Sequence, residues 1–318
     1  MILSASRRTD IPAFYSDWFI NRLREGYAYV RNPMYPKKVS KIILSNETID
    51  CIVFWTKNPS TMIPKLEMLK DYTYYFQYTL NPYSREIETN VPSYEAKIKT
   101  FITLSQYIGK DRVIWRYDPI FLTNTIDTKF HILKFKEMAN TLKEYTSKVV
   151  ISILDNYRKI KKNMDFIGLV DMSKEELALV LTSFKEIADK SNLVIQSCAE
   201  DIDLSSYGIF PGKCIDDHLI SQLTGQSISV SKDRNQREVC QCVESIDIGS
   251  YNTCLHNCKY CYANFNPQIV RKNYEIHDDN SPFLFGNIQD DDIVTERKIK
   301  IYKSLSDQVT FFTNSLNL

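Results

Sequence analysis

The first two hundred residues alternate short apolar runs, rich in β-branched and aromatic residues, with longer amphipathic segments. Apolar runs of this length that end in polar residues predict buried strands, and apolar positions at helical spacing predict the helices between them. The expected strands are 2–6, 51–55, 74–80, 112–115, 149–154 and 193–196. Six alternations of strand and helix predict a parallel sheet with right-handed crossovers, so the fold class is α/β.

The expected helices follow the strands in order. The first carries Phe14, Trp18, Phe19 and Leu23 at helical spacing. A helix capped by Ser60 should follow the second strand, and helices over 93–108, 127–145 and 173–189 should follow the third, fourth and fifth. A capping-box pattern, Ser173-Lys174-Glu175-Glu176, marks the start of the last of these.

Strands that are almost continuously apolar indicate a sheet covered on both faces. A doubly wound sheet and a barrel both fit this pattern, and the polar residues at nearly every strand end favour a barrel, which collects its site at that edge. The chain has eight glycines and contains neither a G-x-G-x-x-G motif nor a phosphate-binding loop.

After residue 200 the pattern changes, so we expect a (β/α) barrel scaffold over 1–200 and a cysteine-rich part over 201–318 that completes the barrel and carries the metal ligands. Within that part, 245–249 is strand-like and about 292–305 is expected to be a short helix. The last dozen residues are expected to form a weakly packed tail or an added strand.

Composition narrows the function classes. Hydrophobic residues make up 43% of the 318 residues, charged residues 25%, and the formal net charge is +1. This composition is typical of a globular protein and gives no overall basic field for nucleic acid. No apolar stretch approaches the roughly 20 residues that a membrane span needs, so we expect a cytoplasmic protein. In a reducing cytosol, cysteines are more often metal ligands or catalytic groups than disulfides, and seven of the eight lie after residue 190.

Three of these cysteines form a compact C-x3-C-x2-C run, Cys254, Cys258 and Cys261, with Tyr260 directly before the third. Three thiolates at this spacing can bind three irons of one 4Fe-4S cluster and leave the fourth iron open to a small molecule. The alternative is a zinc site, for which His256 inside the run is a conceivable fourth ligand.

The run, including Tyr260, resembles the signature of the radical S-adenosylmethionine (SAM) superfamily. That resemblance implies an oxygen-sensitive enzyme on a partial (β/α)6 barrel, in which SAM chelates the open iron and is cleaved to a 5′-deoxyadenosyl radical. It also implies a low-potential electron donor such as flavodoxin or ferredoxin. The substrate, a small molecule or a nucleotide, and the oligomeric state are left open.

The position of the run departs from the superfamily pattern, in which the cysteine loop follows the first strand. A circular permutation would resolve this: 245–249 would be the strand before the cluster loop and would lie beside the chain's first strand. The segments Thr9-Asp10-Ile11-Pro12 and Thr56-Lys57-Asn58-Pro59 are similar to segments of spore photoproduct lyase-like proteins. The whole chain resembles the bacterial family called domain of unknown function 1848, whose members begin with Ser-Ala-Ser-Arg-Arg-Thr-Asp-Ile-Pro and end with this cysteine motif.

A second set of cysteines consists of Cys198, Cys214, Cys240 and Cys242. Four thiols are the number that closes an auxiliary iron–sulfur cluster, such as a second 4Fe-4S cluster, or a zinc site. Burial without any metal is the alternative, chiefly for Cys198 and Cys214. Cys51, in an apolar strand, is expected in the core.

Polar residues at the strand ends complete the candidate site. Arg7, Arg8 and Asp10 are candidates to bind the SAM carboxylate, its ribose or an anionic substrate. The other candidates are Lys57, Asn58, Arg116, Tyr117 and Asp118 as substrate-side residues, and Gln196 and Glu200 with Tyr260 on the cofactor side. For each, a helix cap or an ion pair is the alternative, and Asp10 is placed to cap the first helix.

Two other classes of protein fit the same residues. One is a zinc-dependent hydrolase or transferase with His218 or His256 in its metal shell. The other is a non-enzymatic iron–sulfur or zinc protein for electron transfer or sensing. His277, like His218, is more typical of a surface histidine than of a ligand.

Overall fold

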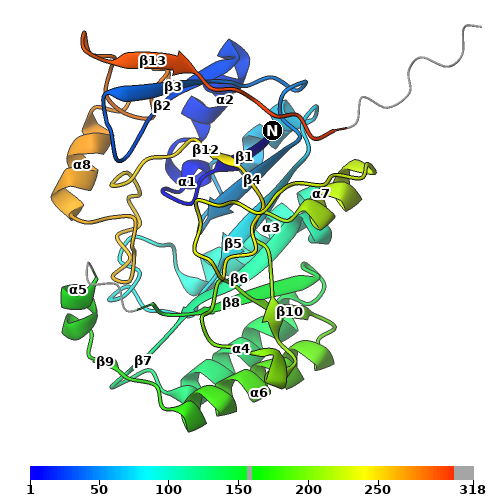
Figure 1. The fold of residues 1–318 in the computed structure, drawn as a ribbon. Coiled ribbons are helices and arrows are strands. Elements are labelled where there is room, and N and C mark those ends of the chain that lie inside the picture. Colours follow the sequence, from blue (N-terminus) through cyan, green and yellow to red (C-terminus); the bar gives the residue numbers. More distant parts are fainter. Residues whose placement is uncertain (156–159, 304–318) are drawn as a thin grey trace, which may run out of the picture.

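The computed structural model describes residues 1–155 and 160–303. Within these residues, eight parallel strands form the main sheet, in the order β12-β1-β4-β5-β6-β8-β10-β11 (Figure 1). The strands are β1 (Ile2–Ala5), β4 (Cys51–Thr56), β5 (Tyr74–Thr79), β6 (Val113–Ile120), β8 (Lys148–Ile153), β10 (Val194–Ser197), β11 (Phe210–Pro211) and β12 (Ile246–Asp247). All six expected strands are therefore present, and the α/β class is confirmed.

From β1 to β11 the strand order follows the chain order without reversal. A doubly wound sheet reverses direction at an internal switch point, whereas this order winds one way. Between the described residues no ladder joins β11 to β12, so the sheet is open. β12 pairs in parallel with β1, through Leu3 with Ile246 and Ser4 with Asp247. This confirms that the segment before the cysteine run lies beside the first strand.

The α-helices of the described residues are α1 (Ile11–Phe14), α2 (Ser16–Glu25), α3 (Tyr94–Ile108), α4 (Thr128–Leu142), α5 (Lys161–Phe166), α6 (Lys174–Lys190), α7 (Asp217–Thr224) and α8 (Pro267–Glu275). Three of them, α3, α4 and α6, begin at the caps that the sequence predicts. Ser93 caps α3, Asp127 caps α4, and Ser173 and Glu176 close the capping box of α6. Because these side chains satisfy amides that lack helical partners, the sequence sets the helix starts well.

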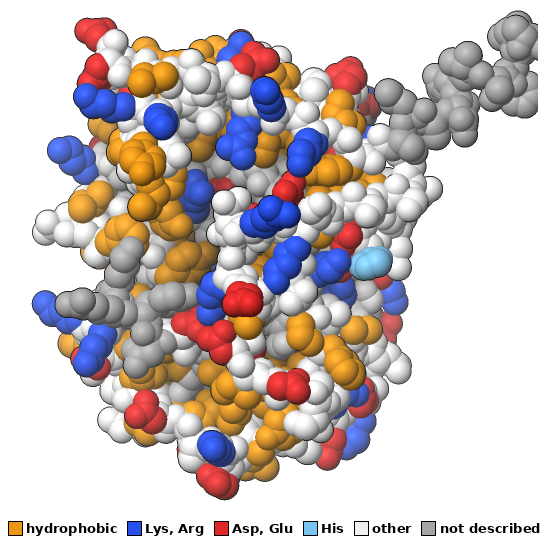
Figure 2. Space-filling model, viewed as in Figure 1, with side chains coloured by type: hydrophobic (Ala, Val, Ile, Leu, Met, Phe, Trp, Pro, Cys, Tyr) orange, Lys and Arg blue, Asp and Glu red, His pale blue; other side chains and the backbone are white. Residues whose placement is uncertain are grey.

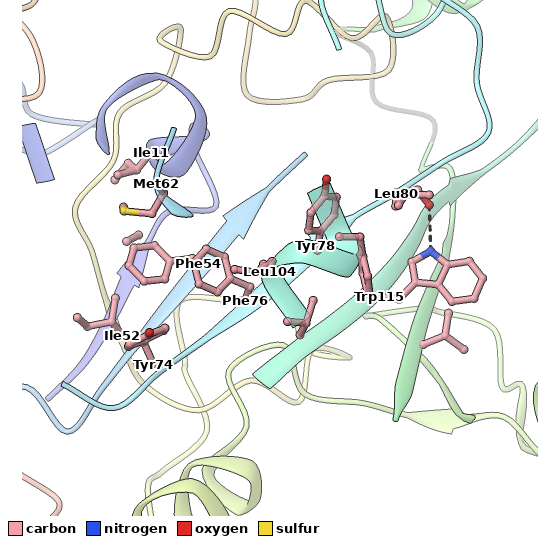
Figure 3. Packing of buried hydrophobic residues seen from close by; sticks show 14 of the residues in the cluster. Ile11, Ile52, Phe54, Met62, Tyr74, Phe76, Tyr78, Leu80, Leu104 and Trp115 are labelled. Atoms are coloured by element: carbon pink, nitrogen blue, oxygen red, sulfur yellow. Dashed lines mark hydrogen bonds between the residues drawn. The ribbon is translucent and has the colours of Figure 1, made fainter. Parts of the chain in front are cut away.

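The two faces of the sheet are covered differently. Alternate side chains such as Ile52, Phe54 and Phe76 join one large core with the apolar sides of α1, α2, α3, α4 and α6 (Figure 3). The intervening side chains, among them Val53 and Tyr75, pack against the segment around α7 that includes Cys214, Cys240 and Cys242. Both faces are buried, as the apolar strands predict. The segment around α7 thus covers the face that the main helices leave uncovered.

Two expected helices differ from the structure. The helix expected after β4 is present as the 3-10 helix Ile63–Leu69, but Ser60 does not cap it. Pro64 has no amide hydrogen to donate to the carbonyl of Ser60, so an α-helix capped by Ser60 would lack that hydrogen bond. The described part of 292–305 contains no helix; the β-branched run there forms the exposed strand β13 (Ile293–Glu296). β13 pairs in parallel with β3 (Lys38–Ile43), which pairs with β2 (Tyr27–Arg31) in a hairpin that the sequence analysis missed. The expected tail, 307–318, lies outside the described residues.

Small elements occupy the connections. β7 (Leu122–Thr123) pairs with β9 (Leu169–Val170), and 3-10 turns lie at Lys110–Arg112 and Ser205–Tyr207. Among the helices of the described residues, none has both the length and the apolar character of a membrane span.

Candidate functional site

A cavity of about 390 Å³ lies at the carboxyl edge of the main sheet. Seven cysteines line it: Cys198, Cys214, Cys240, Cys242, Cys254, Cys258 and Cys261. Its other walls come from the ends of β1, β4, β6 and β8, because the carboxyl ends of parallel strands meet at one edge. The volume is in the range of small-molecule sites. The face drawn in Figure 2 is hollowed near its middle, with charged side chains along one side of the hollow.

The loop that carries Cys254, Cys258 and Cys261 is fixed from several directions. The hydroxyl of Tyr15 donates to the carbonyl of Thr253 at 2.5 Å, and the amide of Lys259 donates to the carbonyl of Ile87 at 2.9 Å. Asn257 adopts φ 53°, a left-handed conformation that asparagine tolerates better than most residues. The three thiols are therefore held on a turn whose backbone is tied to the scaffold.

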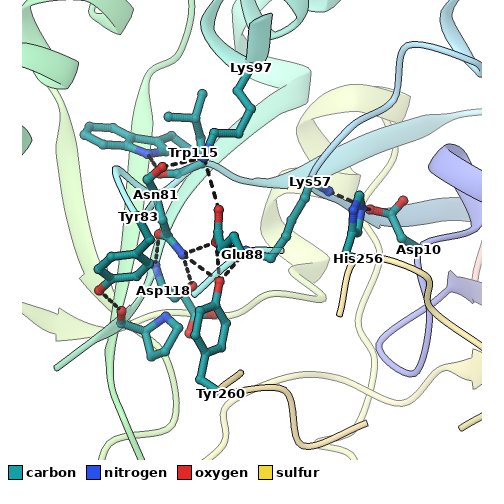
Figure 4. Close-up of polar contacts among 12 residues, drawn as sticks. Asp10, Lys57, Asn81, Tyr83, Glu88, Lys97, Trp115, Asp118, His256 and Tyr260 are labelled. Carbon is teal, nitrogen blue, oxygen red and sulfur yellow. Dashed lines mark hydrogen bonds and ion pairs between the residues drawn. The ribbon is translucent and has the colours of Figure 1, made fainter. Parts of the chain in front are cut away.

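Asp10 is a central tie of this loop. One carboxylate oxygen caps α1 by accepting from the amide of Ala13 at 3.0 Å. The other accepts from the amide of Lys57 at 2.7 Å and lies 2.8 Å from Nε2 of His256 (Figure 4). Both oxygens are committed, so Asp10 acts as cap and positioning residue together. His256 is buried and its Nε2 is engaged with Asp10, which leaves Nδ1 without a protein partner.

A buried network around Glu88 lies beneath the same loop (Figure 4). The ammonium groups of Lys57 and Lys97 donate to Glu88 at 2.9 and 3.0 Å, and the hydroxyl of Tyr260 donates to it as well. Burial opposes ionisation of Glu88, but the two ammonium groups outweigh it and hold the pKa of Glu88 at about 2. Lys57 also donates to the hydroxyl of Tyr260 at 2.8 Å. Tyr260 therefore anchors the cysteine loop to a fixed charge centre.

The cavity is rich in cationic groups. Five of its lining side chains are cationic, namely Arg7, Arg8, Lys57, Arg116 and Arg237, against the carboxylates of Asp10, Asp118 and Asp155. Burial raises the pKa of each thiol in the Cys254, Cys258 and Cys261 loop. A coordinating metal deprotonates such a thiol outright, and the cations favour the resulting thiolates.

Arg7 and Arg8 are positioned by β12 and by the segment after it. The guanidinium of Arg7 donates to Oγ of Ser245 at 3.1 Å and lies over the ring of Trp55. Its Nε is buried without a protein partner. Arg8 lies over the ring of Tyr251. Both arginines line the cavity, as expected.

Arg116 and Asp118 also line the cavity, on β6. The guanidinium of Arg116 donates to the carboxylate of Asp118 and, at 2.7 Å, to Sγ of Cys214. Arg116 therefore contacts the second cysteine set directly, a role that the sequence analysis did not assign.

Four expected site residues are not part of the cavity lining. Tyr117 is buried in the helix-side core and bonds to His131; it lies on the opposite face of β6 from Arg116. Asn58 accepts from the amide of Ser60 in a local turn, and Glu200 accepts from the amide of Ile153 at 2.9 Å. The side chain of Gln196 packs against Gly212, where any Cβ would approach it to 2.8 Å. Asn58, Glu200 and Gln196 thus contact the backbone around the strand ends, whereas Tyr117 belongs to the core.

The histidines are placed as follows. His218 is exposed on α7 and His277 contacts Asp279 at 3.0 Å, and neither lines the cavity. Only His256 of the zinc alternative is close to the cysteines. In residues 1–155 and 160–303, no group of three or more His, Cys, Asp or Glu side chains is arranged to hold a single metal ion.

Sequence reasoning missed Glu88 and Asp247. Glu88 lies in the connection between β5 and α3, where nothing in the local pattern distinguishes it. Asp247, on β12, accepts from the hydroxyls of Ser4 and Ser6 at 2.7 Å and from the amide of Arg7 at 2.9 Å. A carboxylate inside a predicted buried strand is a signal that could have identified it.

Comparison with known proteins adds the family. The family profile described as Domain of unknown function (DUF1848) matches residues 2–263, so the chain belongs to that family. No curated protein matches the chain. Among solved structures, the chain is similar to one described as a "putative alpha-L-fucosidase" from Bacteroides thetaiotaomicron VPI-5482. The identity is 13%, the TM-score is 0.26, and the match covers 71% of this chain and 81% of that one. At that TM-score the likeness carries no argument.

Proposed function

We propose that this chain is a radical SAM enzyme whose catalytic 4Fe-4S cluster is held by Cys254, Cys258 and Cys261. The observation that carries the proposal is the convergence of these three thiols with Arg7, Arg8 and Lys57 in one cavity at the carboxyl edge of the sheet. Three thiols on one turn, rather than four, leave one iron of such a cluster free to bind a ligand.

The residues present fit this group. Nδ1 of His256 and Oγ1 of Thr9 are buried without protein partners, and both residues line the cavity beside the thiols. Unpaired buried polar atoms are costly, so they point to a ligand with polar groups.

A bound cluster of this kind supplies the low-potential electron that reductively cleaves SAM to methionine and a 5′-deoxyadenosyl radical, which then abstracts hydrogen from a substrate. The chain's own residues would prepare the cavity for this chemistry. Arg7 and Arg8 are placed to bind the carboxylate of SAM or an anionic substrate. The walls around the thiols would exclude water from a reactive radical.

The fold supports the finer part of the proposal, a partial radical SAM barrel in circularly permuted order. The strands wind in one direction, and the cysteine loop follows β12, which lies at one edge beside β1. In the sheet, β12 stands before β1 and β4, so the cysteine loop follows the first strand of the spatial order. In the radical SAM superfamily the cysteine loop also follows the first strand, although here that strand comes from the far end of the chain.

Metal and sulfide analysis of the anaerobically purified full chain tests the proposal. Replacing Cys254, Cys258 and Cys261 together by alanine should remove about four irons and four sulfides per chain. Adding SAM to reduced wild-type protein should change its electron paramagnetic resonance signal, because SAM would bind a cluster iron. Zinc without sulfide in wild-type protein would contradict the proposal and support the zinc-dependent alternative.

A further inference from the structure

We propose that Cys198, Cys214, Cys240 and Cys242 form a second metal centre, an iron–sulfur cluster with complete thiolate ligation. These four residues lie in connections between elements and outside the C-x3-C-x2-C run, but they line the same cavity. This centre and the proposed catalytic cluster use different cysteines, so either proposal can fail while the other stands.

The four cysteines pack together. Sγ of Cys198 lies 3.3 Å from Sγ of Cys214. Cys214, Cys240 and Cys242 belong to one buried cluster, and Cys198 packs against it. All four are free cysteines. Thiols that are merely buried scatter through a core, whereas these four face one another and the cavity.

The backbone that carries the thiols is held in place. Cys198 and Cys214 follow the adjacent parallel strands β10 and β11. The carbonyl of Cys214 accepts from the hydroxyl of Tyr75 at 2.7 Å and from the amide group of Gln77 at 2.9 Å. Each of these donors is buried and lies on the central strand β5. The sheet thus fixes the backbone at Cys198 and Cys214.

The segment that carries Cys242 is hydrogen-bonded to the segment that carries Cys214. The amide of Val243 donates to the carbonyl of Ile215 at 3.2 Å, and the amide of Ile215 donates to Sγ of Cys242 at 3.4 Å. The amide of Asp233 donates to the carbonyl of Cys242 at 3.0 Å. Both segments are therefore preorganised, which a metal site requires of its ligands.

A buried arginine contacts this set, and a half-buried one lines the same cavity. Arg116 donates to Sγ of Cys214 at 2.7 Å, and its side chain is only 6% exposed. Arg7 lines the same cavity, and its buried Nε has no protein partner. Four thiolates around a 4Fe-4S core leave a net negative centre, and buried guanidinium groups stabilise such a centre.

All four side chains of this set are thiols, the donors that iron–sulfur clusters take from proteins. Because every iron would then have a protein thiolate, this centre would have no open position for SAM. The two centres would differ in that respect within one cavity.

The test counts irons in the full chain, reconstituted anaerobically with iron and sulfide. Wild-type protein should hold about eight irons in two clusters, and the Cys254, Cys258 and Cys261 triple alanine variant should keep about four of them. SAM should perturb the spectrum of the wild type and leave that of the triple variant unchanged.

Counting wild-type irons by Mössbauer spectroscopy needs no variant and covers the case in which the triple variant does not fold. About four irons in wild-type protein with none in the triple variant, bound zinc in place of the second cluster, or a Cys198–Cys214 disulfide would overturn the proposal. If wild type and triple variant both hold the same four irons, this centre stands and the proposed catalytic cluster fails.

Arg116→Met provides a second test, with Arg116→Lys as the conservative control. Removing the positive charge and its hydrogen bond to sulfur should lower the reduction potential of the second cluster, and lysine should restore part of it. A potential that is equal in all three proteins would contradict the contact between Arg116 and a cluster thiolate.

Discussion

At the scale of single residues, the site depends on buried charges that neutralise one another. Glu88 and Lys97 are each 2% exposed, and Lys57 completes the group beneath the cysteine loop. Removing one member of a buried ion pair leaves the others without compensation, which costs more than the pair itself contributes.

Glu88→Gln should therefore lower the free energy of unfolding by about 3 to 5 kcal/mol, because two ammonium groups would stay buried without a carboxylate. Urea denaturation measures the difference. The matched control is Glu137→Gln, which removes the exposed pair with Lys134 and should cost less than about 1 kcal/mol. Equal costs for the two variants would show that the Glu88 network contributes little.

The burial of His131 predicts that the stability of the folded chain depends on pH, independently of the cysteines. It is fully buried between the hydroxyl of Tyr117 and the carbonyl of Phe121, each at 2.8 Å, and burial lowers its pKa. Below about pH 6.5 the unfolded chain binds a proton at this residue and the folded chain does not. Stability should therefore fall as the pH decreases below that value.

His131→Gln should flatten this loss, whatever its effect on absolute stability. The slope should become shallower by up to about 1.4 kcal/mol per pH unit between pH 6.5 and 5. Denaturant titrations across that range measure it, and His218→Gln, which changes an exposed histidine, is the control. An unchanged slope in His131→Gln would mean that the buried ring accepts a proton in the folded state.

At the scale of elements, helix starts were predictable where a side chain caps them. Ser173 and Glu176 have a local pattern that needs no tertiary information, and the structure confirms both halves of the box. The same reasoning fails at Ser60, where Pro64 prevents an α-helix, and at Ile293, where pairing with β3 decides the structure. Edge strands depend on partners that lie far away in sequence, which local patterns do not contain.

Ser173→Ala should destabilise the protein by about 1 kcal/mol, since it leaves an amide at the start of α6 without a partner. Thermal unfolding should show a lower midpoint. Ser183→Ala, in the middle of the same helix, is the matched control and should be neutral or slightly stabilising. A midpoint for Ser173→Ala that equals that of Ser183→Ala would show that the capping box is not significant for stability.

At the scale of the whole molecule, the sheet class and the strand order near the cysteines followed from the sequence. The alternation of strands and helices predicted the parallel sheet, and the expected neighbour of β1 is indeed β12. The convergence of seven cysteines on one cavity was not predictable in detail. Their positions span Cys198 to Cys261, and only the folded chain shows that both sets line the same space.

The gaps in the predicted site have a common physical cause. Tyr117 was grouped with Arg116 because the two are adjacent in sequence, but neighbouring strand residues point to opposite faces. Glu88 was missed because it reaches the site from a connection between elements. Which face a strand residue points to, and which loops fold over the strand ends, are properties of the assembled sheet.

The central claim, that Cys254, Cys258 and Cys261 support SAM cleavage, is tested most directly by product analysis. Anaerobically reconstituted full chain, reduced with dithionite and given SAM, should form 5′-deoxyadenosine and methionine in equal amounts. Cys51→Ala, which changes a core cysteine outside the cavity, should retain this activity, and the triple alanine variant should lose it. Absence of 5′-deoxyadenosine from wild-type protein that holds iron and sulfide, or equal formation by the triple variant, would contradict the account.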